Sequence, residues 1–308
     1  MQVATFLASA TEIVCALGLR ERLVGVSHEC DWPASGPWSI AGLPRLTRAR
    51  IDGSKPSRAI HDDVEALVRD ALALYQVDLD ALRRAAPDVL VTQDLCAVCA
   101  VGLDDVQRAA ATVLAKDVHI VSLAPRRLAD VWADVERVGE ALGLGMTARA
   151  VAHGLTSRVA RLAERTAGLA PRSVLAIEWL DPLMVGGLWL PELIAIAGGT
   201  ALVGRAGEPG VTIALEVDIE PDVIVVKPCG FELARVRDEL TTHLGRLRAR
   251  WPGARIVAAD GNALFNRSGP RLVESAEVLA AILHPDALPD LVARHRAWFF
   301  EPAPSAAI

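Results

Sequence analysis

Apolar and polar positions along this chain fall into alternating blocks with the lengths of strands and helices. Short apolar runs rich in Val, Ile and Leu predict buried strands, and longer segments with apolar residues at helical spacing predict amphipathic helices. The predicted strands are residues 3–7, 23–26, 87–92, 118–123, 173–177, 221–226 and 255–258. The predicted helices are residues 9–18, 59–74, 78–85, 104–114, 190–197, 235–250 and 270–283. This alternation predicts an α/β protein with parallel sheets.

Two local signals refine this pattern near the N-terminus. Ser9 and Glu12 stand at the spacing of a capping box, so we expect Ser9 to be the N-cap of the first helix. Residues 45–56 are polar and lack a period, and they predict an irregular loop.

A weak internal repeat predicts two lobes of similar build. Residues 86–96 (APDVLVTQDLC) match residues 220–230 (EPDVIVVKPCG), and each stands at a similar position in its half. The segment between the lobes is helical with a break at Gly143-Leu144-Gly145, and residues 147–167 would form one rigid helix of roughly 30 Å. The predicted division is an N-terminal α/β lobe (1–127), a helical linker (128–169) and a C-terminal α/β lobe (170–308). A cleft between two such lobes favours a ligand site.

Composition and charge exclude several classes of function. The net charge is −6 with both signs interspersed, whereas a nucleic-acid-binding protein has a clustered basic face. No segment reaches the roughly 20 apolar residues of a membrane span, so we expect no membrane insertion. No Lys or Arg precedes the first apolar stretch and Glu12 interrupts it, which argues against a secretory signal. The sequence therefore predicts a cytoplasmic protein.

Four of the five cysteines follow predicted strands: Cys30, Cys96, Cys99 and Cys229. In an open α/β sheet, ligands bind outside the carboxyl ends of the strands, so these thiols are candidate ligands of one metal site. In a reducing cytosol, four thiolates suit zinc or an iron–sulfur cluster. The equally weighted alternative is four separate, buried and inert thiols. Cys15 lies within an apolar helix and is assigned to the core.

The same strand ends carry a histidine, a glutamate and three tryptophans. His28 can ligate a metal, including the cobalt of a corrinoid, through a neutral ring nitrogen, and the alternative is a loop histidine bonded to backbone. Glu29 is interpreted as a loop hydrogen-bonding residue rather than a catalytic acid. Trp32, Trp179 and Trp189 supply large flat rings that would suit a flat macrocycle.

Several of these segments together resemble a known family. They are residues 8–33 (ASATEIVCALGLRERLVGVSHECDWP), the PDVLV strand at 87–91, the long linking helix, and residues 260–271 (DGNALFNRSGPR). From Val3 to about Leu283 the chain resembles the metal-chelate-type substrate-binding proteins of ABC importers, and most of all their cobalamin-binding subgroup.

This resemblance implies two Rossmann-like lobes joined by a single long α-helix, with a ligand cleft between them. It implies a protein that binds a corrinoid, haem or a ferric siderophore and that works with an ABC permease, rather than an enzyme. In the family, the loops that hold ligand correspond roughly to those of Trp32 and Trp189 and to the loop with Asn262, Phe265 and Arg267. Arg267 could bind amide or phosphate oxygens with its rigid fork, and its alternative role is a salt bridge within the C-terminal lobe.

The leading hypothesis is a cytosolic binding protein for cobalamin or a similar corrinoid, with cysteines in its cleft. The alternative is a zinc or iron–sulfur protein on the same scaffold, with a role in sensing, metal transfer or redox chemistry. A thiol–disulfide enzyme is least favoured, because the CxxC of Cys96 and Cys99 does not open a helix in a thioredoxin-like order. No Gly-x-Ser-x-Gly, HExxH or Walker motif points to another enzyme class.

Overall fold

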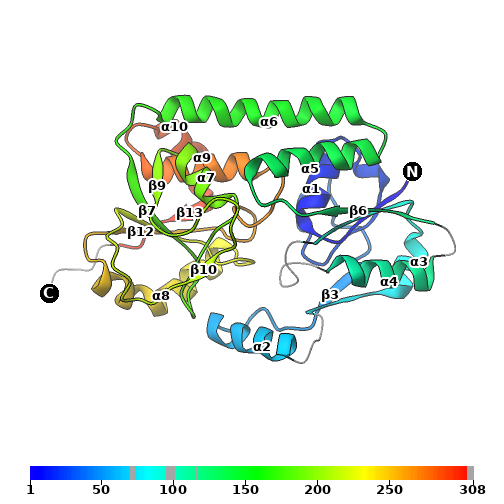
Figure 1. The fold of residues 1–308 in the computed structure, drawn as a ribbon, viewed down its shortest axis with the longest axis horizontal. Coiled ribbons are helices and arrows are strands. Elements are labelled where there is room, and N and C mark those ends of the chain that lie inside the picture. The colour runs from blue at the N-terminus through cyan, green and yellow to red at the C-terminus, as the bar shows by residue number, and fades with distance from the viewer. Residues whose placement is uncertain (70–73, 95–100, 115–116, 304–308) are drawn as a thin grey trace. The chain divides into compact units, whose positions relative to one another are not determined.

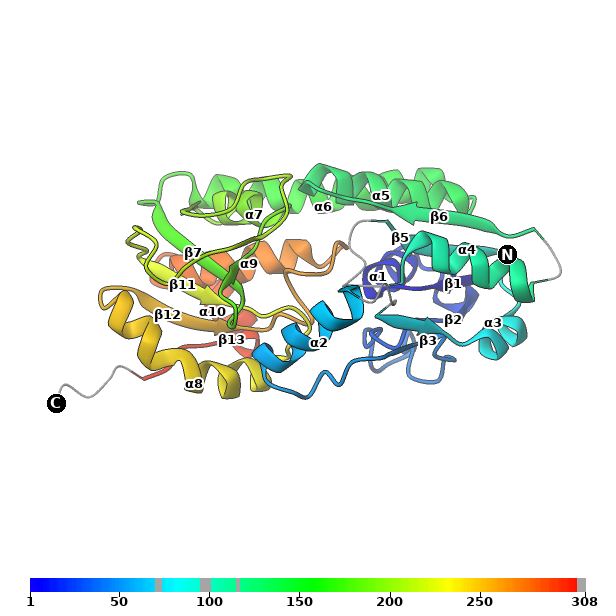
Figure 2. The same ribbon diagram turned by 60° about the horizontal axis from the view of Figure 1, so that its bottom comes forward.

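The structure of this chain is a computed structural model that describes residues 1–69, 74–94, 101–114 and 117–303. Strands and helices alternate through most of this length, which confirms the predicted α/β class (Figures 1 and 2). By internal contacts the chain divides into two units. Unit 1 comprises residues 1–55, 59–125 and 129–155, and unit 2 comprises residues 56–58, 126–128 and those from 156 onward. The division falls inside the long helix α6 (Gly145–Thr166), so the segment predicted as a linker is shared by the two units.

Unit 1 is built on a four-stranded parallel sheet in the order β2-β1-β5-β6. Its strands are β1 (Val3–Thr5), β2 (Leu23–Gly25), β5 (Val89–Gln93) and β6 (His119–Leu123). A separate antiparallel pair is formed by β3 (Thr47–Ala49) and β4 (Tyr75–Val77). The helices that lie wholly or mostly in this unit are α1 (Ala8–Ala16), α2 (Ser57–Arg69), α3 (Leu79–Ala85), α4 (Leu103–Val113) and α5 (Leu128–Ala141), with a 3₁₀ turn at Arg20–Arg22. The first residues of α2 and α5 fall in unit 2. Apolar residues of the sheet, α3 and α4 form one buried cluster.

Unit 2 is built on a mixed sheet in the order β10-β8-β7-β11-β12-β13, and β9 also pairs with β7. Its parallel strands are β7 (Arg172–Trp179), β9 (Gly199–Ala201), β11 (Val223–Val226) and β12 (Arg255–Ala259). Its antiparallel edges are β8 (Met184–Val185), β10 (Val211–Thr212) and β13 (Phe299–Phe300). Its helices are α7 (Leu190–Ile196), α8 (Leu233–Arg250), α9 (Leu272–Leu283) and α10 (Pro289–His295), with a 3₁₀ turn at Arg296–Trp298. Figure 1 shows α8 on one side of this sheet and α7 and α9 on the other.

The predicted repeat is present as the central strand of each sheet. β5 lies between β1 and β6, and β11 lies between β7 and β12, all in parallel register. The Pro-Asp pair before each strand has the same role. Asp88 Oδ2 accepts the Gln2 N–H at 2.7 Å, and Asp222 Oδ2 accepts the Ser173 N–H at 2.7 Å. We call Asp88 and Asp222 the clamp aspartates.

Each clamp aspartate ties its strand to both neighbours. The Asp222 N–H donates to Ser173 O at 3.0 Å, and the Asp222 carbonyl accepts from Arg255 N at 2.9 Å. The Asp88 N–H and carbonyl make the corresponding bonds with Gln2 and His119, at 2.9 and 3.1 Å. Three strands therefore start at one level, which sets the register of the sheet.

Two local predictions are wrong. Helix α1 begins at Ala8 with Leu7 as its N-cap, and that cap makes no side-chain hydrogen bond. Ser9 and Glu12 lie inside the helix and are buried, because the turn from β1 is so short that Ser9 already falls within the first helical turn. Residues 45–56 are not wholly irregular, because β3 lies among them. Its three residues are too few to show a strand period, and they are ordered by pairing with β4.

Other element boundaries are close to the predicted ones. Helix α6 (Gly145–Thr166) corresponds to the predicted rigid helix, and Gly143 before it has a φ of +75°. That conformation favours glycine and ends α5. Within the described residues, no helix is both long and apolar enough to cross a membrane.

We expect the substitution Asp222→Ala to lower the free energy of unfolding by about 1 kcal/mol at pH 7, because an exposed charge-assisted hydrogen bond contributes modestly. Backbone and side-chain hydrogen bonds from Ser173 lower the pKa of Asp222. The contribution of Asp222 is therefore present above the unfolded-state pKa of about 3.9 and is lost as the pH falls through the lower folded-state value.

Urea denaturation of the wild type and the variant between pH 7 and pH 2 measures this difference. Asp218→Ala, at an exposed aspartate nearby, is the control and should change little. A stability difference for Asp222→Ala that stays constant down to pH 2 would contradict the role of the carboxylate.

Candidate functional site

The carboxyl ends of the parallel strands are where ligands bind in α/β folds. In unit 1 the residues that follow β1, β2, β5 and β6 form what we call the first rim. In unit 2 the residues at and after the ends of β7, β11 and β12 form the second rim. Each rim is described by itself.

The first rim includes His28, three residues after the edge strand β2. Its Nδ1 lies 2.7 Å from Thr47 Oγ1, and its backbone N–H donates to the same oxygen at 3.0 Å. The Thr47 hydroxyl donates to Ser27 Oγ at 3.1 Å. His28 Nε2 lies 3.0 Å from Glu29 Oε1, and the His28 and Tyr75 rings are 5.4 Å apart between centroids.

The hydroxyl, imidazole and carboxylate of this group stand in the order of a catalytic triad. Thr47 is only 4% exposed as a residue, and its hydroxyl proton is directed to Ser27 rather than to His28. A nucleophile must be accessible and must give its proton to the base. The group therefore holds an imidazole in place but does not activate Thr47.

Thr47 reaches His28 because β3 is anchored by its neighbour Leu46. Leu46 is fully buried, and its N–H donates to Val26 O at 2.8 Å. The fit requires Gly25 in β2, since a Cβ there would lie 2.7 Å from the Leu46 side chain. A glycine and a leucine thus determine where the Thr47 hydroxyl stands.

The structure places the Cys30 thiol inside unit 1. Cys30 is 1% exposed, and its Sγ lies 3.1 Å from Thr11 Oγ1, which in turn lies 2.6 Å from Thr5 Oγ1. Arg45 Nη1 donates to the Cys30 carbonyl at 2.7 Å. The thiol is therefore packed against the hydroxyl of α1.

The four-cysteine site stays a prediction. Cys96 and Cys99 lie outside the described residues. Cys229 is half-buried at the second rim, where its N–H donates to Glu178 O at 3.2 Å. Among the residues that the structure describes, no three His, Cys, Asp or Glu side chains stand close enough to hold a metal ion.

The second rim contains a buried lysine that the sequence reasoning missed. Lys227 directly follows β11, and its side chain is 1% exposed. Its Nζ lies 3.2 Å from Glu178 Oε2 and donates to Asn266 Oδ1 at 2.8 Å. The Glu178 side chain is 36% exposed, so the pair presents a carboxylate at the surface with an ammonium behind it. The sequence did contain a signal for this residue, because Lys227 is a single basic residue directly after the apolar run VIVV of residues 223–226.

Two glycines allow this pair to be so compact. A Cβ at Gly186 would lie 2.4 Å from Glu178 Oε2 and 3.2 Å from Lys227 Nζ. A Cβ at Gly261 would lie 2.0 Å from the Pro228 carbonyl oxygen. A side chain at position 186 would displace the Glu178 carboxylate, and a side chain at position 261 would displace the backbone at Pro228.

Four residues predicted to bind ligand contact one another in two pairs; three of them lie in the loop before α9, and Trp189 is the N-cap of α7. Trp189 donates its indole N–H to Phe265 O at 2.7 Å, and Arg267 Nη2 donates to Asn262 Oδ1 at 2.9 Å. Trp189, Phe265 and Arg267 are all under 9% exposed, and Asn262 is half-buried. In this structure Asn262, Phe265 and Arg267 build the loop and Trp189 bonds to it, and contact of these four residues with a ligand stays a prediction.

The other two predicted tryptophans are more accessible. Trp179 ends β7 and packs edge-on against Phe231, with ring centroids 5.2 Å apart. Its indole N–H donates to Asp181 O at 3.1 Å and to Ser57 O at 3.2 Å, both within unit 2. Trp32 in unit 1 is 38% exposed. Trp179 is half-buried, and contact of either ring with a ligand stays a prediction.

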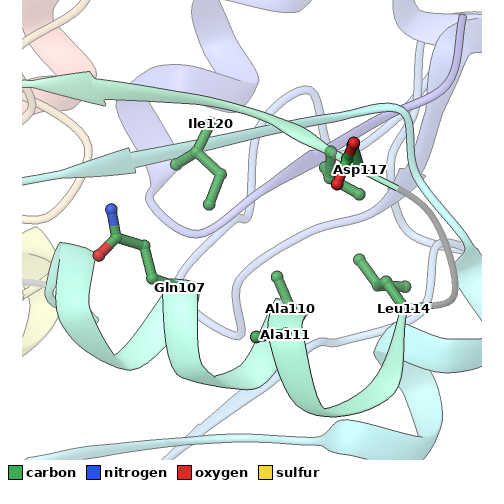
Figure 3. A pocket seen from close by; sticks show the side chains of 7 residues that line it. Gln107, Ala110, Ala111, Leu114, Asp117 and Ile120 are labelled. Atoms are coloured by element: carbon green, nitrogen blue, oxygen red, sulfur yellow. The ribbon is translucent and has the colours of Figure 1, made fainter.

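A cavity of about 700 Å³ lies elsewhere in unit 1, between α4 and the start of β6 (Figure 3). Gln107 and Asp117 are its polar lining residues and lie at opposite ends of the cavity in this view, with Leu114 and Ile120 among the apolar ones. It is at the amino end of β6, away from the first rim. Without convergent polar groups, it is not the candidate site.

Comparison with solved structures identifies the architecture. A periplasmic haem-binding protein from Pseudomonas aeruginosa matches with a TM-score of 0.72 at 18% sequence identity, over 99% of both chains. The chain has the fold of periplasmic binding proteins. The periplasmic vitamin B12 binding protein of Vibrio cholerae matches with a TM-score of 0.63 at 16% identity, over 94% of this chain and 98% of that one.

A third structure agrees with these two. The periplasmic haem-binding protein from Roseiflexus sp. RS-1 matches with a TM-score of 0.62 at 20% identity, over 94% of this chain and 98% of the other. No protein-family model and no curated protein sequence matches this chain. The predicted fold is therefore confirmed, while the structural neighbours include haem binders as well as a B12 binder.

We expect Lys227→Met to lower the free energy of unfolding by about 3 kcal/mol, because it leaves Glu178 and Asn266 without the ammonium between them. Lys55→Met is the matched control, since Lys55 pairs with Asp63 at 2.6 Å on the surface, with both side chains more than one-third exposed. Chemical denaturation of both variants measures the difference. Equal, small effects would show that the buried lysine has no structural role.

Proposed function

We propose that this protein binds a metal–tetrapyrrole chelate of the cobalamin or haem class. The observation that carries the proposal is the similarity over 99% of both chains to a haem-binding protein. The vitamin B12 binding protein of Vibrio cholerae supports the same class of ligand. The sequence resemblance favours cobalamin within that class.

Each rim, taken by itself, carries groups that suit a macrocycle with a polar edge. The first rim offers the imidazole of His28 and the ring of exposed Trp32, and the second offers the Glu178 carboxylate beside Trp179. Aromatic rings pack on flat macrocycles with little loss of entropy, and carboxylates accept hydrogen bonds from amide donors such as those of a corrinoid. Binding, rather than catalysis, is the activity that these groups support.

The location of the protein is a separate proposal. We propose from the sequence that it is cytoplasmic, although the matched solved proteins are periplasmic. Fractionation of cells that produce the protein at native levels, with marker enzymes for each compartment, tests this. Recovery with periplasmic markers would contradict it.

We expect the purified protein to bind hydroxocobalamin or haemin with saturation. A chelate at 100 times its dissociation constant should stabilise the native state by about 2.7 kcal/mol, because it binds the native state alone. Calorimetric titration and thermal unfolding with each chelate measure the two effects. Ferric ion without a chelating ring is the control and should produce neither effect.

The outcome against the proposal is equally clear. If neither hydroxocobalamin nor haemin gives a binding heat or a rise in the unfolding temperature, the protein does not bind this class of ligand. A response to haemin alone would support the class but would contradict the preference for cobalamin.

A further inference from the structure

One short segment of the chain belongs to unit 2, although the residues on either side of it belong to unit 1. It comprises residues 56–58 and contains the first residue of α2. Ser57 is 1% exposed, and its backbone N–H and its hydroxyl both donate to Glu239 Oε1 in α8. Its carbonyl accepts the indole N–H of Trp179 at 3.2 Å. We call these three hydrogen bonds the Ser57 anchor.

The anchor supplies what the start of α2 lacks in its own sequence. The first N–H groups of a helix have no partner within it, and a side-chain acceptor on the preceding residue commonly satisfies one of them. Pro56 precedes this helix, and its side chain has no acceptor. The Glu239 carboxylate takes that place from another element, 2.9 Å from the Ser57 nitrogen. Its negative charge also suits the positive end of the helix dipole.

Helix α2 buries little of itself apart from this residue. Of its 13 residues, all of which the structure describes, Ser57 alone is buried, and Val68 near the other end is 58% exposed. A helix of this length is marginal in water, and most helices in proteins are stabilised by tertiary packing. The helical state of α2 therefore depends strongly on the Ser57 anchor.

His243 faces the same carboxylate without competing for it as a cation. Its Nε2 lies 3.7 Å from Glu239 Oε1, one turn along α8. Burial and the neighbouring Arg246 lower the pKa of His243, although Glu239 acts in the opposite direction. The imidazole is therefore neutral at pH 7, and the hydrogen bonds of Glu239 Oε1 remain with Ser57.

Trp179 links the anchor to the second rim. It is the last residue of β7, next to Glu178, and its ring packs against Phe231. Its one N–H is shared between Ser57 O and Asp181 O. A ligand that packed against this indole would hold it in the position from which it bonds to Ser57.

We propose that α2 is a conditional helix, formed while the Ser57 anchor is closed, and that a chelate held against Trp179 favours the closed anchor. The first half stands on the contacts of Ser57, and the second half rests also on the proposed function. Because coupling between two sites is reciprocal, opening the anchor must in turn weaken the binding of that chelate. The order of α2 would thus respond to occupancy of the second rim.

Amide hydrogen exchange of residues 57–69, followed by mass spectrometry, tests the first half. Glu239→Ala keeps α8 helical and should speed the exchange of these amides roughly tenfold, as the loss of a helix cap implies. Asp238→Ala, at the exposed carboxylate beside it in α8, is the matched control and should change nothing. Exchange in α9 should be equal in all three proteins. If Glu239→Ala also speeds exchange in α9, Glu239→Gln, which removes the charge and keeps the shape, replaces it with the same expected direction.

The second half is tested with haemin and hydroxocobalamin as probes, each at saturation. A chelate that binds should slow the exchange of residues 57–69 in the wild type by roughly threefold or more, since it stabilises the state that it binds. It should also bind Glu239→Ala more weakly than Asp238→Ala in a calorimetric titration.

The outcomes separate the inference from the proposed function. Equal exchange of residues 57–69 in the wild type and in the Glu239 variants would show that the anchor does not hold α2, and the inference fails. A wild type that binds neither chelate refutes the proposed function and the second half of the inference with it. A wild type that binds a chelate while exchange in α2 stays the same refutes the second half and leaves the proposed function standing.

Discussion

Both rims depend on the bonds that the clamp aspartates make at the opposite ends of the sheets. In a parallel sheet, neighbouring strands that start at one level also end at one level, so the loops that follow them emerge side by side. A shift of one residue would turn every inward side chain of a strand outward. Asp88 and Asp222 prevent that shift by accepting a backbone N–H from the adjacent strand while their own backbone joins both neighbours. The geometry of the candidate site is therefore set by residues at the far end of each strand.

The buried ion pair of the second rim, Lys227 with Glu178, requires the ends of β11 and β7 to stand level. Removing a charge from water costs several kcal/mol, and only a close partner of opposite charge offsets that cost. Lys227 is placed at the end of β11, level with the end of β7, where Glu178 stands. Gly186 leaves room for the Glu178 carboxylate, and Asn266 Oδ1 accepts a second hydrogen bond from the Lys227 ammonium. An ion pair of this kind tolerates little displacement of its strands.

Much of this architecture could be predicted from the sequence, for physical reasons that also explain the failures. The strands around Val89 and Val223 are buried on both faces and so read as continuous apolar runs, and the Pro-Asp pair marks their start. β3 and β4 could not be predicted, because strands of three residues show no period and are ordered by a partner distant in the chain. The capping box failed because Ser9 and Glu12 have the right spacing but the chain turns too early.

The sequence directs attention to the strand ends as a candidate site, and ligand binding there stays a prediction. His28 and the strand ends follow from the sequence, because residue types and their place after a strand are visible there. The role of Thr47 and the burial of Lys227 depend on contacts between segments far apart in the chain, which no local pattern records. Cys30 shows the same limit, since its place after a strand favoured a metal ligand and a buried thiol equally, and only the structure shows its thiol against Thr11.

Gly25 affects the position of a polar group at the first rim although it has no polar group of its own. It has no side chain, yet it leaves the space that Leu46 fills, and Leu46 is bonded in sequence to the threonine that orients His28. Related chains with a larger residue at this position would have to move that leucine, and the imidazole would then be free to rotate. A change of one methyl group at Gly25 would thus alter the setting of the imidazole while every polar residue around it stayed the same.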